Sequence, residues 1–229
     1  LFAGLAHTDY GTGTFQIAVS CTANTTGSTT NVWSGTLTFS KSTVLSQTIP
    51  NIAVGAVCVI TEPTRGGATS VTLPSNATIV NGGTVSRNVT NTFDYAQLRV
   101  TKQVVTDAED ETATAVILDW PFTVRVVCTF NGGQVYADGY RSGSPMVLTL
   151  AAGASATLTK LPSGASCTLT ETAPGNADST DIRYVTTSNP GGTTAVGTTA
   201  TFTLTRDVSG AGTNTATVNN RYGVASFTV

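Results

Sequence analysis

FQIAVSC, residues 15–21, alternates in the manner of a β-strand with one buried face, on which Phe, Ile, Val and Cys lie together. The pattern returns as FTVRVVC at residues 122–128, with Phe, Val, Val and Cys in the matching places. Period-two alternation over such a length favours a strand whose apolar side chains enter a core. The recurrence suggests that the chain contains one domain twice.

Two further blocks recur in the same order. IAVGAVCVITE at 52–62 matches LPSGASCTLTE at 161–171, where a glycine marks a turn and the cysteine precedes a glutamate by four residues. VTNTF at 89–93 matches VNNRY at 218–222, with an asparagine at the centre of each. Chance explains three blocks in one order poorly, and we therefore predict an internal repeat.

The composition indicates an all-β fold. Threonine makes up about one residue in five, which favours strands and turns because β-branched side chains fit a pleated surface. Charged residues are only 10% of the chain and the net charge is −2, which excludes nucleic acid and an anionic membrane surface as partners. No apolar run approaches the roughly 20 residues that span a bilayer, so we expect no membrane insertion. The predicted fold class is all-β, with two tandem β-sandwich domains.

The repeat sets the expected domain boundaries. We predict a first domain at 1–94 that lacks its first strand, a second domain at 95–222, and at 223–229 the first strand of a following repeat. No flexible linker separates the first two domains. The Gly, Pro, Asn and Ser content predicts loops, among them 24–30 and 188–192.

The four cysteines point to disulfides rather than to a metal site. No CxxC spacing is present, and within each copy the cysteines are 37 and 39 residues apart, on strands whose other inward residues are apolar. We therefore predict the disulfides Cys21–Cys58 and Cys128–Cys167 in an exported protein. Closing a loop of this size stabilises a domain by about 4 kcal/mol in the chain-entropy description.

A lysine, a glutamate and an asparagine of the second copy fall on core faces. In LRVTKQV, residues 98–104, the even positions are apolar except for Lys102, so the alternation directs this amine inward. Glu171 shares a face with a cysteine and a leucine of its strand, and Asn220 shares one with a valine and a tyrosine. Buried charges must be paired or neutralised, so the simplest interpretation is a buried Lys102–Glu171 ion pair beside an amide.

These residues resemble the CnaB-like (prealbumin- or immunoglobulin-like) repeat domains of Gram-positive, actinobacterial, cell-surface proteins, of the cysteine-containing kind. Such domains have V-x-K in the first strand, a Glu in the middle and an Asn in the last strand, which Val100-Thr-Lys102, Glu171 and Asn220 match in order. The resemblance covers nearly the whole chain and implies two immunoglobulin-like β-sandwiches. It also implies an intramolecular isopeptide bond between Lys102 and Asn220, with Glu171 as the proton-transfer catalyst. A satisfied Lys/Glu pair without the bond is the alternative.

The first copy has only part of this set. Glu62 and Asn91 stand in the matching places, but no lysine precedes the first strand block. Counted back by the spacing that separates Lys102 from its own block, the equivalent position falls several residues before Leu1. Either sequence outside this chain supplies the missing strand, or the tail 223–229 of one molecule completes the first domain of another in a strand-exchanged homo-assembly.

Two function classes remain. We expect a structural stalk or repeat module of a bacterial surface or pilus-like fibre, extracellular and anchored to the cell wall, whose partners are neighbouring repeats of the same protein. The alternative is an adhesin module that binds a host protein or glycan. Aromatic rings stack on sugar faces, so exposed aromatic side chains could form a carbohydrate platform, although packing in the core or at its rim is their more common role. The candidate aromatic side chains are Trp33, Trp120, Tyr136, Tyr140 and Tyr184.

An enzyme is disfavoured. His7 is the only histidine, a loop residue by its surroundings, and no serine or cysteine can be given a base from the sequence. The acidic run at 107–111 lacks the glycine and the spacing of a calcium loop and is expected to be solvated. We expect no catalysis with turnover, no metal and no cofactor.

Overall fold

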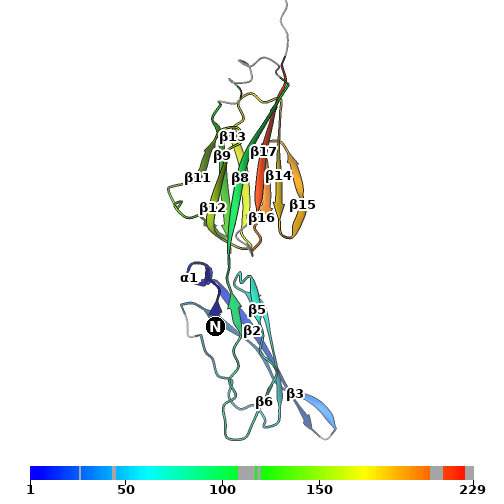
Figure 1. The fold of residues 1–229 in the computed structure, drawn as a ribbon. Helices are drawn as coiled ribbons and strands as arrows, with labels where there is room; N and C mark the ends of the chain where they lie inside the picture. The colour runs from blue at the N-terminus through cyan, green and yellow to red at the C-terminus, as the bar shows by residue number, and fades with distance from the viewer. Residues whose placement is uncertain (26, 43–44, 108–116, 118–119, 207–213, 225–229) are drawn as a thin grey trace, which may run out of the picture. The chain divides into compact units, whose positions relative to one another are not determined.

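The protein is almost entirely β in a computed structural model, which confirms the predicted fold class (Figure 1). The structure describes residues 1–25, 27–42, 45–107, 117, 120–206 and 214–224. Its contacts divide the chain into two compact units, Leu1–Asp94 and Tyr95–Val229. Each unit is a small β-sandwich of the immunoglobulin-like kind, and each is described by itself below.

Two sheets form the second unit. In one sheet the strands follow the order β10-β9-β13-β16, and β11 also pairs with β9. In the other sheet the order is β12-β8-β17-β14-β15. The first sheet comprises β9 (Phe122–Phe130), β10 (Gly133–Val135), β11 (Met146–Leu150), β13 (Ser166–Ala173) and β16 (Thr199–Thr203). The second comprises β8 (Tyr95–Thr106), β12 (Ser155–Pro162), β14 (Ser179–Thr186), β15 (Asn189–Val196) and β17 (Thr215–Tyr222).

Alternating apolar residues build the core between these sheets. In β9 every second residue from Phe122 to Cys128 is buried, and in β8 Leu98 and Val100 are fully buried in the same cluster as β13 and β17 residues. Removing this apolar surface from water is the main term that stabilises the unit. The period of two therefore also determines which polar side chains of these strands are carried inward.

The first and last strands of the second unit are neighbours. β8 and β17 run parallel, with Val218 opposite Lys102 and Asn220 opposite Val104, and Figure 1 shows them side by side. The other pairs in this sheet are antiparallel. This register brings residues that are more than a hundred positions apart in sequence onto one patch of the core face.

The first unit has one long-stranded sheet and one sheet of very short strands. The order is β3-β2-β4-β6 in the long-stranded sheet and β1-β7-β5 in the other. A four-residue helix, α1 (His7–Tyr10), follows β1, so His7 begins a helix and not a loop. The strands are β1 (Phe2–Ala3), β2 (Thr14–Thr25), β3 (Ser28–Ser40), β4 (Val57–Arg65), β5 (Ser70–Thr72), β6 (Ala77–Thr78) and β7 (Thr90–Thr92).

A short strand stands where the sequence predicted a missing first strand. β1 runs parallel to β7, with Phe2 opposite Asn91, as β8 runs parallel to β17 in the second unit. Phe2 also packs against Phe15 and Phe93, whose rings lie under this sheet. The first unit therefore has a two-residue strand, β1, at the place where the sequence predicted none. At the other end of the chain, most of the predicted strand at 223–229 lies outside the described residues.

The disulfides join Cys21 to Cys58 and Cys128 to Cys167, as the sequence predicts. Each bond links directly opposite residues of two neighbouring strands, β2 with β4 in the first unit and β9 with β13 in the second. All four cysteines are buried, so the disulfides belong to the cores.

Candidate functional site

Lys102 lies wholly inside the second unit. β8 buries Ala96, Leu98, Val100 and Lys102 in turn, and Lys102 is 0% exposed. Its Nζ lies 3.1 Å from Glu171 Oε1, donates to the carbonyl of Val218 at 3.3 Å, and sits 4.6 Å from the centre of the Phe122 ring. A carboxylate, a carbonyl and an aromatic face thus surround the amine. Their interactions with it offset part of the free-energy cost of its burial. The sequence prediction of an inward lysine matches this position.

Glu171 joins the lysine to the asparagine. Its side chain comes from β13 in the facing sheet and is 2% exposed. Oε1 lies 3.1 Å from Lys102 Nζ and accepts a hydrogen bond of 3.1 Å from Asn220 Nδ2. Oε2 accepts no hydrogen bond from any residue that the structure describes. One carboxylate oxygen therefore contacts both the amine and the amide.

The Asn220 carboxamide is held from several sides. It is 1% exposed, and Nδ2 donates to the Pro174 carbonyl at 3.0 Å in addition to Glu171. Oδ1 accepts a hydrogen bond of 3.1 Å from the Thr180 hydroxyl on β14. The Tyr222 hydroxyl lies beside Nδ2 and donates to the same Pro174 carbonyl. These contacts fix the amide carbon in place while Thr180 polarises its carbonyl.

Burial pushes both titratable groups toward their neutral forms. Desolvation lowers the pKa of Lys102, and the neighbouring Glu171 carboxylate opposes that change. Desolvation likewise raises the pKa of Glu171, opposed by Lys102 and Asn220. Burial also raises the pKa of Tyr222, which keeps its phenol protonated. Both shifts increase the share of the neutral amine and of the carboxylic acid, which are the forms that a nucleophile and a proton donor require.

In the first unit Glu62 and Asn91 meet in the equivalent way. Asn91 Nδ2 donates to Glu62 Oε1 at 2.8 Å, and the two side chains are 5% and 7% exposed. Lys41 is the only lysine of residues 1–94; it is exposed and donates to the carbonyl of Thr8. In the described part of this unit no lysine therefore contacts the pair.

Some of the site could not be read from the sequence. Tyr222 shares the face of Asn220 on β17, which alternation shows. Thr180 and Pro174 reach the amide only through the register of β14 against β17 and through the turn after β13. No local pattern marks these two residues, because the contacts depend on which strands become neighbours.

The residues weighed for other chemistry do not assemble a second site. His7 is exposed, and its ring bonds the Gly4 carbonyl and the neighbouring Thr8 hydroxyl. Among the described residues no three His, Cys, Asp or Glu side chains gather in a way that would hold a metal. Of the acidic run at 107–111, only Asp107 falls within the described residues.

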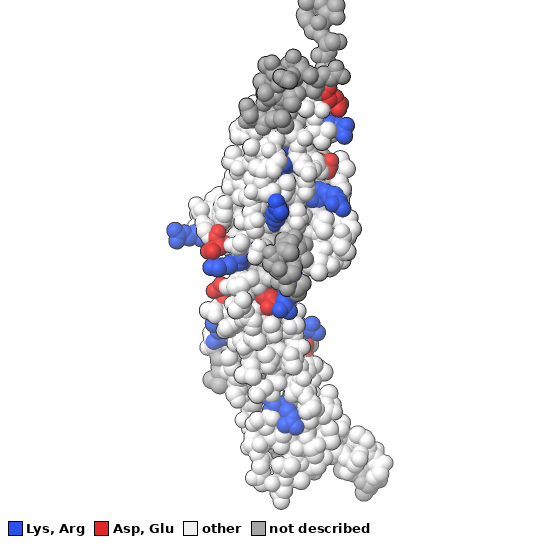
Figure 2. All heavy atoms as spheres, viewed as in Figure 1, with Lys and Arg blue, Asp and Glu red and all other residues white. Residues whose placement is uncertain are grey.

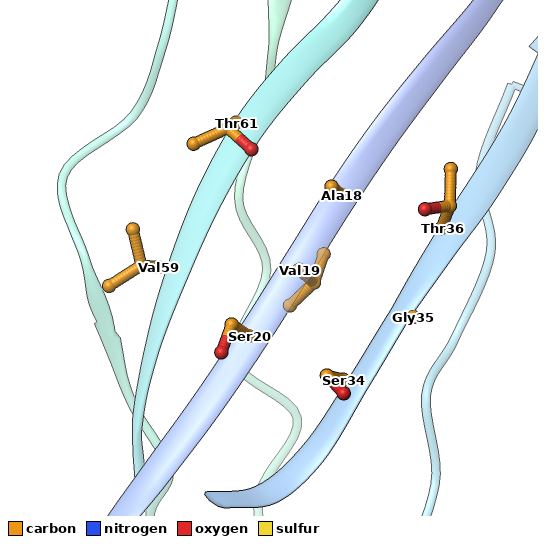
Figure 3. Close-up of a pocket in the computed structure, with 8 residues that line it drawn as sticks. All are labelled: Ala18, Val19, Ser20, Ser34, Gly35, Thr36, Val59 and Thr61. Carbon is orange, nitrogen blue, oxygen red and sulfur yellow. The ribbon is translucent and has the colours of Figure 1, made fainter.

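A shallow hollow of about 330 Å³ lies on β2, β3 and β4 of the first unit (Figure 3). Small side chains line it, including Ala18, Ser20, Ser34 and Thr36, and none of its lining residues is charged or titratable. Of the candidate glycan-binding aromatics, Tyr184 stacks on Phe202 against the core. The others are half-buried or exposed and are not grouped around this hollow.

Charged side chains are sparse on the surface. Figure 2 shows them singly or in small groups of both signs on the visible face, without a broad patch of one sign. In the part of the chain that the structure describes, no helix has the length and apolar character to cross a membrane.

One protein family matches most of the chain. The model of the family described as "Domain of unknown function (DUF5979)" matches residues 3–94 and again residues 98–223. The two matches coincide closely with the two units and support the internal repeat. A comparison with curated protein sequences found no match.

Several solved structures are similar at low identity. They include a major pilin of Streptococcus pyogenes (14% identity, TM-score 0.45, 96% of this chain and 95% of that one) and a second S. pyogenes major pilin (13%, 0.37, 97% and 96%). A Mobiluncus mulieris adhesin with intramolecular disulfide, isopeptide and ester cross-links is similar at 15% identity and a TM-score of 0.40, over 91% of this chain and 85% of that one. Likeness at this level does not extend to function.

Proposed function

This chain belongs to the DUF5979 family, and we propose that it is a structural repeat module of the CnaB-like kind from a bacterial surface or pilus-like protein. In this proposal each unit is braced by its disulfide, and the second unit is braced further by an isopeptide bond between Lys102 and Asn220. The module serves as a stalk, and its partners are neighbouring repeats of the same protein.

A single arrangement carries the proposal: a buried amine and a buried carboxamide that contact one carboxylate oxygen. Lys102 Nζ and Asn220 Nδ2 both lie 3.1 Å from Glu171 Oε1, inside an apolar core. A buried ion pair alone contributes little net stability, because the cost of desolvation offsets much of the attraction. Covalent closure would remove that cost, since a secondary amide carries no charge.

The proposed reaction is a transamidation that occurs once. The neutral Lys102 Nζ attacks Cγ of Asn220, while Glu171, as the acid, protonates the amide and then passes the lysine's proton to the leaving nitrogen. Rotating the carboxamide about its last torsion turns its oxygen toward Glu171 for the first step. The Nζ–Cγ bond forms, the Cγ–Nδ2 bond breaks, ammonia departs, and Glu171 returns to its starting form.

The disulfides support an extracellular location. Both pairs are buried and bridge adjacent strands, and such bonds persist in oxidising compartments but are rare in the cytosol. The sparse charge and the absence of a one-sign patch on the visible face fit a spacer better than a nucleic-acid or membrane ligand. Anchoring to the cell wall is part of the proposal and rests on the resemblance to CnaB-like repeats.

Intact mass tests the cross-link. We expect the purified chain, after correction for two disulfides, to weigh less than its calculated mass by one ammonia. Lys102→Ala should restore the full calculated mass, because no other lysine contacts Asn220 among the described residues. Peptide mapping should recover Lys102 and Asn220 in one branched peptide.

Two matched variants sharpen the test. Lys160→Ala removes an exposed lysine of the same unit, paired at the surface with Asp138, and should leave the ammonia deficit unchanged. Glu171→Gln keeps the shape of the site but cannot relay a proton, so the full mass should be retained. A wild-type chain of full calculated mass would refute the isopeptide bond and leave a buried ion pair.

A further inference from the structure

The sequence Asn-Gly-Gly occurs once in each unit, at residues 81–83 and 131–133, and the chain contains no other Asn-Gly pair. A glycine after an asparagine leaves its own backbone nitrogen open to approach, because it has no side chain. A Cβ built at Gly82 or at Gly132 would meet nothing within 4 Å, and both asparagines are exposed. Local sequence and exposure therefore do not distinguish the two sites.

The backbone does distinguish them. Asn131 and Gly132 form the two-residue turn that joins β9 to β10, and both have a positive φ, +49° and +78°. Phe130 and Gly133 are paired directly across this turn. Two positive φ values define the type I′ hairpin turn, which Asn-Gly favours. The paired strands on its two sides therefore hold the Asn131–Gly132 peptide in one orientation.

Asn81 lies in an irregular segment of the first unit. It falls between β6 and β7, at residues 79–89, where the structure assigns no strand. Of the Asn-Gly pair Gly82 alone has a positive φ, +67°. Backbone hydrogen bonds hold Ile79 to the loop before β4, and the Arg87 side chain donates to carbonyls of the loop before β6. The Asn81–Gly82 peptide therefore has no paired strand on either side to fix its orientation.

An asparagine reacts with the next backbone nitrogen only in one orientation of the peptide that joins them. The glycine nitrogen must turn toward the asparagine Cγ, so that the two atoms close a five-membered ring at the high effective concentration of an intramolecular attack. The left-handed backbone of Asn131 directs the Gly132 nitrogen away from the side chain, and reversing this breaks the pairing of Phe130 with Gly133. Asn81 can make the rotation without opening a hairpin. Ring closure at Asn131 therefore has to follow a local opening of the structure, with its added free energy.

We propose that Asn81 is a site of spontaneous modification, where the carboxamide becomes a carboxylate, and that the hairpin protects Asn131 from the same reaction. The Gly82 nitrogen loses its proton to hydroxide and attacks Cγ of Asn81. The Cγ–Nδ2 bond breaks, and the leaving nitrogen takes a proton from water and departs as ammonia. Water then opens the cyclic imide at one of its two carbonyls, which gives aspartate or the isomer whose backbone runs through the former side chain. Either product adds one negative charge to a chain of net charge −2.

Peptide mapping of an aged sample tests the assignment. Cleavage after arginine isolates Asn81 in residues 66–87 and Asn131 in residues 126–141, and fragment spectra separate Asn81 from Asn76 in the first peptide. When the folded parent is kept at mildly alkaline pH, the 66–87 peptide should gain the mass difference between a hydroxyl and an amino group and separate into two isomers. We expect this change to be at least about tenfold faster than in the 126–141 peptide, because the hairpin must open first there. Both rates should rise with pH, since the attacking nitrogen must lose its proton.

Unfolding supplies the matched control, because both sites then have the same Asn-Gly-Gly sequence on an unpaired backbone. In guanidinium chloride, with the disulfides reduced, the two rates should become equal. In the folded parent, a rate at Asn131 equal to or above that at Asn81 overturns the inference, and so does a parent that stays unmodified at Asn81. The cyclic imide also lacks one ammonia, but Asn81→Gln abolishes that deficit, since a six-membered ring closes less readily, whereas Lys102→Ala does not. This proposal and the isopeptide bond are therefore tested separately.

Discussion

Two opposing free energies act on the Lys102 ammonium: the cost of removing it from water and its attraction to the Glu171 carboxylate. Moving an ammonium from water into a protein interior costs several kcal/mol even after relaxation, and attraction to a buried carboxylate repays this only with good geometry. Here one carboxylate oxygen is shared between the lysine and Asn220, while the other has no partner among the described residues. The contacts of the ion pair therefore offset only part of the cost of burying its two charges. This favours the neutral forms of Lys102 and Glu171.

The first prediction concerns pH in a chain that cannot cross-link. The variant Asn220→Ala cannot form the bond. Burial raises the pKa of Glu171 above its ordinary value of 4.5, so just above pH 4.5 the folded unit binds more protons than the unfolded one. The free energy of unfolding of this unit therefore falls as pH rises through that range. Lys102 has a pKa lowered below 10.5, so at alkaline pH the folded unit binds fewer protons and gains stability as pH rises toward 10.5. We expect a minimum in the free energy of unfolding at intermediate pH.

Urea unfolding followed by Trp120 fluorescence in a Trp33→Phe background measures this profile for the second unit alone. The control adds Lys102→Met and Glu171→Gln, which removes both titrations while roughly keeping volume. Its profile should lack the minimum. A minimum of equal depth in the control would assign the pH dependence to other groups.

Alternation alone was enough to predict the inward direction of Lys102, Glu171 and Asn220, because each lies on a strand with clearly apolar neighbours on one face. It could not predict Thr180, opposite Asn220, or Val71, opposite Asn91, whose contacts depend on strand partners far away in sequence. The completeness of the two sites differs mainly through these cross-strand neighbours and the amine. Residue identity within one strand is thus a weaker guide to chemistry than register between strands.

At the scale of elements, β1 is held by a close approach of two backbones. Gly4 follows β1 with a φ of +84°, and a Cβ there would lie 2.1 Å from the carbonyl oxygen of Phe93. The Phe93 amide donates to the Ala3 carbonyl, and the Ala6 amide donates to the Phe93 carbonyl. Only glycine allows this junction.

The second prediction follows for Gly4→Ala. The added methyl must displace the Phe93 backbone and so break the hydrogen bonds between β1 and β7. The Tm of the first unit should therefore fall well below that of the parent. Gly82→Ala is the matched control: its φ is +67°, yet nothing lies within 4 Å of the added Cβ. It should cost about 1 kcal/mol of backbone strain, or roughly 4–8 °C in Tm. Fluorescence melts of Trp33 in a Trp120→Phe background measure both, and equal losses would contradict the steric account.

Two predicted loops are shorter than expected: the chain turns between Thr25 and Ser28 and between Thr186 and Asn189, and strands occupy the rest of both segments. β2 and β3 extend through most of residues 24–30, and β15 occupies residues 189–192. Turn-forming residues are tolerated there because β15 pairs on one side only, and its pairing with β14 shifts register between Thr186 and Tyr184. Composition marks residues that permit a turn, whereas pairing partners determine whether the strand continues.

For the molecule as a whole, the two units share a plan but differ in their second layer. In the second unit that layer has five strands, of 8 to 12 residues each, while in the first it has three strands of 2 or 3 residues. The repeat and the disulfide pairs were predictable because they leave local signals. The short strands of this layer in the first unit could not be predicted, because the loops that replace longer strands leave no local signal in the sequence.

The third prediction concerns reduction. Breaking either disulfide opens a loop of 37 or 39 residues and removes about 4 kcal/mol in the chain-entropy description, almost the same amount for each unit. Because the first unit has less paired backbone in its second layer, we expect it to unfold at a lower temperature than the second under reducing conditions. Single-tryptophan chains with Trp33 or Trp120 alone report the two melts, and coincident melts would contradict this order.

The parallel pairing of β8 with β17 decides how the second unit would respond to being pulled by its ends. Grips at Tyr95 and Tyr222 sit at opposite ends of the ladder that pairs Arg99 with Thr215 and Thr106 with Tyr222. Stretching therefore loads all the hydrogen bonds between β8 and β17 in shear at the same time and does not open them one by one. The two strands can separate only when these hydrogen bonds break together.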